Sequence, residues 1–120
     1  MQYGDVAVVP MKDASGHLWN YQLLNPDGSK RQPKDARTKD LFHMIGKSTD
    51  GQPIGVAESY VTSASCYELT GVPTACAFSC ENLKHIVMIL KQKYPKSRVI
   101  IFADNDRHLE CQGLVNSNKR

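Results

Sequence analysis

The alternation of three short apolar runs with two helix-like segments limits the fold of this chain more than any other sequence feature. The apolar runs cover residues 54–57, 73–78 and 98–103, and the helix-like segments cover 60–70 and the stretch between Asn82 and Pro95. Short runs rich in branched residues are typical of buried parallel strands. Parallel strands need crossover connections, so the order β-α-β-α-β predicts an α/β fold with a parallel sheet and flanking helices.

Residues at the ends of the two helix-like segments support this prediction. Ser59 can cap the first helix, and Gly71 is placed to end it. Asn82 can cap the second helix, and Pro95 cannot continue it. The second helix has apolar residues at the spacing of one buried face, namely Leu83, Ile86, Val87 and Leu90.

The N-terminal part of the chain predicts a β-hairpin region over residues 5–31. Val6 to Met11 is strand-like, and Trp19, Tyr21 and Leu23 alternate with polar residues in the pattern of a half-buried strand. Four aromatic residues could stack on nucleic-acid bases, namely Trp19, Tyr21, Tyr60 and Tyr67. We expect core packing instead for most of them.

A polar, turn-rich stretch at 47–53 follows a short apolar patch at 41–45, which is expected to form another small strand. This stretch predicts a boundary between two parts of the chain. The first part, 1–50, is a β-rich N-terminal subdomain, and the second, 51–120, is the α/β core.

The composition is that of an ordinary globular protein, with 41% hydrophobic and 22% charged residues in a chain of 120. No apolar run approaches the length of a membrane span, which is about 18 residues. The first residues have neither the basic stretch nor the apolar core of a signal peptide. A cytoplasmic location without membrane contact is therefore expected.

Basic residues gather in one short segment, although the formal net charge is only +3. Lys30, Arg31, Lys34, Arg37 and Lys39 lie within ten residues of one another. Such a cluster can be a solvated loop, or it can contact a phosphate backbone with an affinity that falls steeply with salt. Both interpretations remain open from the sequence alone.

Acidic residues follow two of the apolar runs. Glu58 comes directly after the first run, and Asp104 and Asp106 come directly after the third. Ligands bind outside the carboxyl ends of parallel strands, so these three acids are expected to meet at one sheet edge. Clustered carboxylates repel one another unless a cation neutralises them, and oxygen ligands suit Mg²⁺. The alternative is that they are helix caps and surface charges.

Four segments in a fixed order resemble the TOPRIM domain of primases, topoisomerases, recombination factors and some nucleases. They are residues 15–31, 56–65, 70–73 and 103–106. The similarity covers about residues 5–108 and is greatest to primases carried by phages, plasmids and other mobile elements, including the TraC-type primases of plasmid transfer. It implies a Rossmann-like core and makes Glu58 the TOPRIM glutamate.

The resemblance further implies a catalytic and metal-binding role for Glu58, Asp104 and Asp106, with Mg²⁺ or Mn²⁺ as the cofactor. It makes single-stranded DNA template, nucleoside triphosphates and the other domains of a longer primase the expected partners. Two departures stand out. Ser59 replaces the usual glycine, and the chain ends before the final strand and helix of the family, so we expect a core truncated at its C-terminal end.

Three functions are therefore carried forward. The leading one is the TOPRIM domain of a DNA primase, which makes RNA primers by metal-dependent nucleotidyl transfer in plasmid or phage replication or transfer. This chain is expected to be inactive alone. The alternatives are a non-catalytic nucleic-acid-binding TOPRIM module and a TOPRIM-type metal-dependent nuclease. Lys30, Arg31, Lys34 and Arg37 are the candidate contacts to nucleic acid or nucleotide, on the basis of their charge.

Overall fold

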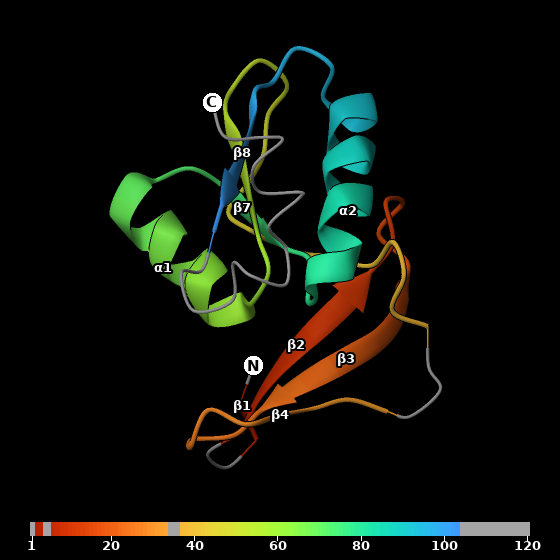
Figure 1. Ribbon diagram of the computed structural model, residues 1–120, viewed down its shortest axis with the longest axis vertical. Helices are drawn as coiled ribbons and strands as arrows, with labels where there is room; N and C mark the ends of the chain where they lie inside the picture. Colours follow the sequence, from red (N-terminus) through yellow and green to blue (C-terminus); the bar gives the residue numbers. More distant parts are fainter. Residues whose placement is uncertain (1, 4–5, 34–36, 104–120) are drawn as a thin grey trace.

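The computed structural model describes residues 2–3, 6–33 and 37–103, which form two sheets and two helices (Figure 1). An antiparallel sheet is built first along the chain, and a mixed sheet with helices on both sides follows it. The fold is thus the mixed α/β architecture expected from the sequence. None of the helices in the described ranges is long and apolar enough to cross a membrane.

The antiparallel sheet has the strand order β1-β2-β3-β4. Its strands are β1 (Gln2–Tyr3), β2 (Val6–Lys12), β3 (Leu18–Leu24) and β4 (Lys30–Arg31). The central pair is a hairpin, as predicted, and its register shifts between Met11 and Lys12. β4 pairs with the end of β3, with Leu23 opposite Arg31 and Leu24 opposite Lys30.

The mixed sheet has the strand order β5-β7-β6-β8. Its strands are β5 (His43–Ile45), β6 (Ile54–Ala57), β7 (Thr74–Cys76) and β8 (Val99–Phe102). β6 runs parallel to both β7 and β8, which confirms the three predicted parallel strands, and β5 is antiparallel at one edge. The last strand of the antiparallel sheet ends at Arg31, and the first strand of the mixed sheet begins at His43. The boundary expected between residues 50 and 51 stays a prediction.

The helices cover opposite faces of the mixed sheet (Figure 1). α1 (Tyr60–Thr70) connects β6 to β7, and α2 (Cys80–Lys93) connects β7 to β8. Ser59 caps α1 by accepting a hydrogen bond from the Thr62 amide, and Gly71 ends it in the left-handed conformation, as predicted. The expected cap of α2 was wrong, because Ser79 and not Asn82 accepts the capping hydrogen bond.

The main apolar core lies between the mixed sheet and α2. Its fully buried members include Ile54 and Val56 from β6 and Ile86 and Leu90 from α2. Their spacing on α2 is the predicted i, i+4 stripe, which buries one face of the helix. Apolar burial of this kind, at about 25 cal/mol per Å², is the main stabilising contribution to the fold.

The opposite face of the sheet, which α1 covers, contains a close contact at a glycine. A Cβ at Gly55 would collide with the ring of Phe102 and lie 2.9 Å from Thr74 Oγ1. Ser63 of α1 is fully buried, and its hydroxyl donates to the Ser59 carbonyl at 2.8 Å. The close contact of β6 and β8 therefore depends on glycine at position 55.

Asn82 joins the beginning of α2 to the segment that leads from one sheet to the other. Its side-chain amide donates to the carbonyls of Leu41 and Ala77 at 2.8 and 2.9 Å, and its carbonyl accepts from the Asp40 amide at 2.8 Å. The residue is 5% exposed. A side chain with three such bonds cannot also act as the helix cap, which explains why Ser79 has that role.

The predicted alternation along β3 is correct, but the face expected to be buried is the exposed one. Asn20 and Gln22 are buried, whereas Trp19 is 50% and Tyr21 is 44% exposed. The buried amides have partners, because Asn20 Nδ2 donates to the Arg37 carbonyl at 3.1 Å and Gln22 Nε2 donates to Gln32 at 3.2 Å. The expectation that Trp19 and Tyr21 pack in the core is therefore wrong.

Candidate functional site

The carboxyl end of β6 places Glu58 at the edge where parallel strands end. Ala57, the last residue of β6, is opposite Phe102, the last residue of β8. Glu58 directly follows the first of these strand ends. Asp104 and Asp106, the other two predicted acids, lie outside the described residues, so their meeting with Glu58 stays a prediction.

The connections of β6 and β8 make this edge a topological switch point. The chain leaves β6 through α1 to reach β7 on one side, and it returns through α2 to reach β8 on the other side. Ligands in open α/β sheets bind at such a point, outside the carboxyl ends of the strands. Glu58 therefore lies where this topology favours a binding site.

Ser59 replaces the expected glycine without strain in the backbone. Its φ of −108° and ψ of 159° are extended values that any residue adopts. Its hydroxyl accepts a hydrogen bond from the Thr62 amide at 3.2 Å, which a glycine could not do because it has no side chain. The departure from the family pattern thus gives α1 a side-chain cap directly after Glu58.

The pKa of the buried Cys76 thiol is affected by charges near this edge. Burial raises the pKa of its thiol to about 12, and the negative charge of Glu58 acts in the same direction. The positive charge of Lys30 lowers the pKa of the same thiol, although by less than burial raises it. The Cys76 thiol also donates to the Glu58 carbonyl at 3.7 Å. Lys30 and Glu58 thus act on one buried group, although they come from different sheets.

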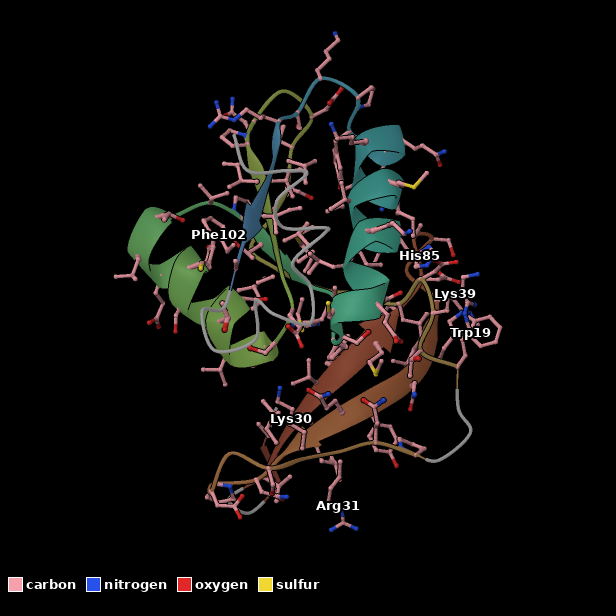
Figure 2. All side chains as sticks on the ribbon, in the orientation of Figure 1. Trp19, Lys30, Arg31, Lys39, His85 and Phe102 are labelled. Carbon is pink, nitrogen blue, oxygen red and sulfur yellow. The ribbon has the colours of Figure 1, made fainter. Side chains whose placement is uncertain are left out.

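The side chains of the predicted basic cluster do not all point the same way. Lys30 and Arg31 are neighbours on β4, so their side chains point to opposite faces of the antiparallel sheet. Figure 2 shows Lys30 directed toward the mixed sheet and Arg31 directed away from it. Arg37 packs its guanidinium over the ring of Trp19 at 4.8 Å from the centroid. Lys34 lies outside the described residues. Of the described members of the cluster, Lys30 is the one that points toward the mixed sheet and lowers the pKa of the Cys76 thiol.

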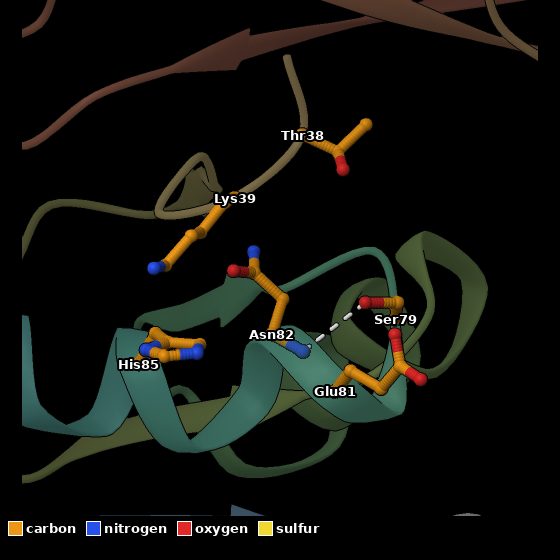
Figure 3. A pocket seen from close by; sticks show the side chains of 6 residues that line it. All are labelled: Thr38, Lys39, Ser79, Glu81, Asn82 and His85. Carbon is orange, nitrogen blue, oxygen red and sulfur yellow. Dashed lines mark hydrogen bonds between the residues drawn. The ribbon is translucent and has the colours of Figure 1, made fainter. Parts of the chain in front are cut away.

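A cavity of about 210 Å³ opens at the beginning of α2 (Figure 3). Lys39 and His85 line it together with Thr38, Ser79, Glu81 and Asn82. The His85 imidazole lies 3.8 Å from the Asp40 carboxylate, and both side chains are more than one-third exposed. Lys39 belongs to the basic cluster found in the sequence. The role of His85 in this cavity was missed, because the helical pattern places it only on a polar side.

These features define a Rossmann-like α/β domain with an acidic residue at the switch point and a lysine near it. The chain is also 32% and 35% identical to two proteins of Escherichia coli called DNA primase TraC, over 121 and 109 residues. The alignments cover 98% and 88% of this chain but 11% and 8% of the relatives. The chain thus spans about a tenth of the length of these relatives. No protein-family model matches it.

Two solved structures share the fold at low sequence identity. The primase fragment of the bacteriophage T7 primase-helicase protein has a TM-score of 0.61 and 13% identity, over 94% of this chain and 47% of that one. T7 primase domains of gp4, bound to an RNA/DNA hybrid and dTTP beside the lagging-strand polymerase, have a TM-score of 0.59. Their identity is 15%, over 89% of this chain and 59% of that chain. The chain is therefore a domain with a primase-type fold and with sequence relatives among primases.

Proposed function

We propose that this chain is the TOPRIM domain of a DNA primase that makes RNA primers for plasmid or phage replication or transfer. The observation that carries the proposal is the position of Glu58, at the switch point beside the end of β8. The sequence relatives named DNA primase TraC support the same function. The single-stranded DNA template, nucleoside triphosphates and the other domains of a longer primase are the proposed partners.

Glu58, Asp104 and Asp106 are the proposed ligands of Mg²⁺ or Mn²⁺. The donor set fits a hard cation, since it consists of carboxylate oxygens, and Glu58 leaves the sheet at a strand end paired with that of β8. Asp104 and Asp106 follow β8 in the sequence. When bound, the metal would stabilise negative charge on a phosphoryl group during nucleotidyl transfer.

Lys30 and Lys39 are the side chains of this chain proposed to attract phosphate groups toward that edge. Lys30 acts on the same buried thiol as Glu58, so its charge is felt at the strand ends. Lys39 lines the cavity at the beginning of α2, where helix amides also favour an anion. Arg31, Arg37 and Lys34 are proposed to contact nucleic acid away from the metal.

The test of the metal site is an amide-NMR titration of the chain with Mn²⁺. We expect paramagnetic broadening around residues 58 and 103–106, and loss of that broadening in Glu58→Gln. Asp50→Asn is the matched control, since Asp50 is an exposed carboxylate that accepts a hydrogen bond from the Lys96 amide at 2.9 Å. Broadening that is uniform, or that survives both Glu58→Gln and Asp104→Asn, would exclude the proposed site.

The test of the chemistry is RNA primer synthesis by the intact protein that contains this sequence. The double variant Asp104→Asn with Asp106→Asn is expected to abolish primer synthesis on single-stranded DNA, whereas Asp50→Asn should leave it unchanged. Metal-dependent cleavage of the DNA in place of primer synthesis would favour the nuclease. DNA binding without either reaction would favour the non-catalytic module.

A further inference from the structure

β3 carries an exposed aromatic surface that the strand-end site does not use. Among the described residues, Trp19 and Tyr21 are 50% and 44% exposed, and both lie on the outward face of this strand. Asn20 and Gln22 occupy the inward face of the strand, where their side-chain amides are buried and hydrogen-bonded. The rings of Trp19 and Tyr21 therefore lie on the outward face. Exposed apolar side chains that gather in this way mark interaction surfaces.

The indole of Trp19 is held in one orientation although half of it is exposed. Its Nε1 donates a hydrogen bond to Asp13 Oδ2 at 2.8 Å. The His17 imidazole packs edge-on against it, with ring centroids 5.0 Å apart. Asp13 is itself fixed, because it accepts bonds from the Ser15 hydroxyl and the His17 amide. A ring that is already oriented loses little conformational entropy when a ligand stacks on it.

Arg37 supplies a fixed positive charge on one face of the same ring. Its guanidinium lies 4.8 Å from the Trp19 centroid, and its Nε donates to the Lys39 carbonyl at 3.0 Å. The backbone of Arg37 is held from the other direction, because Asn20 Nδ2 donates to its carbonyl. The cation and the ring thus form one rigid unit on the surface.

A second arginine lies at the other end of the aromatic row. Arg31 is opposite Leu23, and Leu23 shares the outward face of β3 with Trp19 and Tyr21 because side chains alternate along a strand. The carboxylates of Asp13 and Asp27, in the two turns beside this face, accept hydrogen bonds from Ser15 and Ser29 of their own turns, which lower the pKa of each carboxyl and keep both negatively charged. The outward face of β3 between these turns offers rings flanked by two exposed arginines. We define Trp19, Tyr21, Leu23, Arg31 and Arg37 as the aromatic face.

We propose that the aromatic face binds single-stranded nucleic acid, with bases stacked on Trp19 and Tyr21 and phosphates paired with Arg31 and Arg37. Stacking requires bases that are not already paired, so single strands fit this surface better than duplexes. Guanidinium groups at both ends favour an anionic chain over an apolar protein segment. This inference deepens the proposed function. Binding of the nucleic acid does not depend on that function, but its role as template or primer rests on it.

The intrinsic fluorescence of the chain can be used to follow this binding, because Trp19 is its only tryptophan. Single-stranded oligodeoxythymidylate and oligouridylate are titrated at low salt with EDTA present, so that no metal site contributes. We expect quenching of the Trp19 fluorescence and a matching rise in the anisotropy of a labelled oligonucleotide. A duplex of the same length should bind more weakly, and the two single strands show whether DNA or RNA is preferred.

Four variants separate stacking from charge. Trp19→Ala is expected to weaken binding about tenfold by anisotropy, whereas Trp19→Phe should retain most of the affinity. Arg31→Gln and Arg37→Gln should each reduce the slope of log affinity against log salt by about 0.7. Leu69→Ala is the matched control, because Leu69 is an 86% exposed apolar residue on α1 and should not change binding.

Two results would overturn the proposal. One is equal affinity of Trp19→Ala and the unchanged chain, and the other is concentration-dependent self-association that Trp19→Ala abolishes, which would make the face an interface between copies. Failure of this proposal is distinct from failure of the proposed function. Glu58→Gln should retain oligonucleotide binding in EDTA, and Trp19→Ala should retain the Mn²⁺ broadening.

Discussion

β6 and β3, one strand from each sheet, place different kinds of side chain at their buried positions. In the mixed sheet, every residue of β6 from Ile54 to Ala57 is buried and apolar or glycine. In the antiparallel sheet, the buried positions of β3 are amides, and the aromatic rings beside them are exposed. Apolar burial stabilises the first sheet. In the second, the hydrogen-bonded amides of β3 share the interior with Val9 and Met11 of β2, and the rings of β3 are left available for a ligand.

This difference fits the roles proposed for the two sheets. A metal or phosphate site needs rigid strand ends, and the mixed sheet supplies them through a close-packed core. A binding surface for a flexible strand needs exposed rings with fixed orientation, and the hairpin supplies those. The contacts that join the two regions include the bond from Lys93 Nζ to the Ala14 carbonyl at 2.9 Å and the paired backbone bonds of Lys12 and Phe42.

The largest expected effect comes from the core of the mixed sheet. Leu90→Ala should lower the free energy of unfolding by about 3 kcal/mol, because a fully buried leucine leaves a cavity that the packed sheet cannot close. Urea unfolding followed by circular dichroism measures the change. Met88→Ala, two residues earlier on α2 but 59% exposed, should change stability by less than about 0.5 kcal/mol. Equal effects of the two variants would contradict the assigned core.

The junction between the sheets gives the next largest effect. Asn82→Ala should cost about 2 kcal/mol, since the buried carbonyls of Leu41 and Ala77 would both lose their donor. Hydrogen exchange should show increased opening of segment 40–42 in particular. Gln92→Ala, an exposed amide near the end of α2, is the control and should leave stability and exchange unchanged. If Asn82→Ala behaved like the control, the side chain would not hold the junction.

The sequence was sufficient for the three parallel strands and for α1, because these elements are specified locally. The apolar runs, the cap at Ser59 and the stop at Gly71 depend on neighbouring residues, and all were predicted correctly. Asn82 was assigned wrongly, because its partners at Leu41 and Asp40 are about forty residues away in the sequence. A cap that competes with long-range hydrogen bonds cannot be identified from local spacing.

The faces of β3 could not be predicted for a similar reason. A period of two separates the faces of a strand but does not say which face is buried. Asn20 is buried because the Arg37 carbonyl accepts its amide, and that partner is 17 residues away. The proximity of Lys30 to the strand-end edge also depends on how the two sheets pack. For the candidate site, the sequence thus identified Glu58 and the basic cluster. It could not show that the side chains of the cluster point in different directions.

The antiparallel sheet should show a smaller loss than the junction. Asn20→Ala should lower the free energy of unfolding by about 1 kcal/mol, because it removes the bond to the Arg37 carbonyl at a partly buried site. Trp19→Ala, at the exposed neighbouring position, should change stability by less than about 0.5 kcal/mol. Thermal unfolding of the two variants compares them directly. A larger loss for Trp19→Ala would mean that the rings stabilise the hairpin and that the two sheets are alike after all.

The smallest expected effect concerns His43, on β5 at the edge of the mixed sheet. Burial, and then the positive charge of Lys12, lowers the pKa of its imidazole below the ordinary value of 6.5. The unfolded chain therefore binds a proton at higher pH than the folded protein does, and stability rises with pH in this range. The contribution is complete above about pH 6.5 and is lost as the pH falls toward the pKa of the folded state.

Urea midpoints measured from about pH 7.5 down to about pH 5 test this contribution. The midpoint of the unchanged chain should decrease across this range, and His43→Gln should decrease less because it has no proton to bind. Gln92→Ala, which alters an exposed amide near the end of α2, should follow the unchanged chain. An equal pH dependence in His43→Gln would show that the charge of this imidazole is tolerated in the folded state. In that case the edge of the mixed sheet would accept polar groups as readily as the antiparallel sheet does.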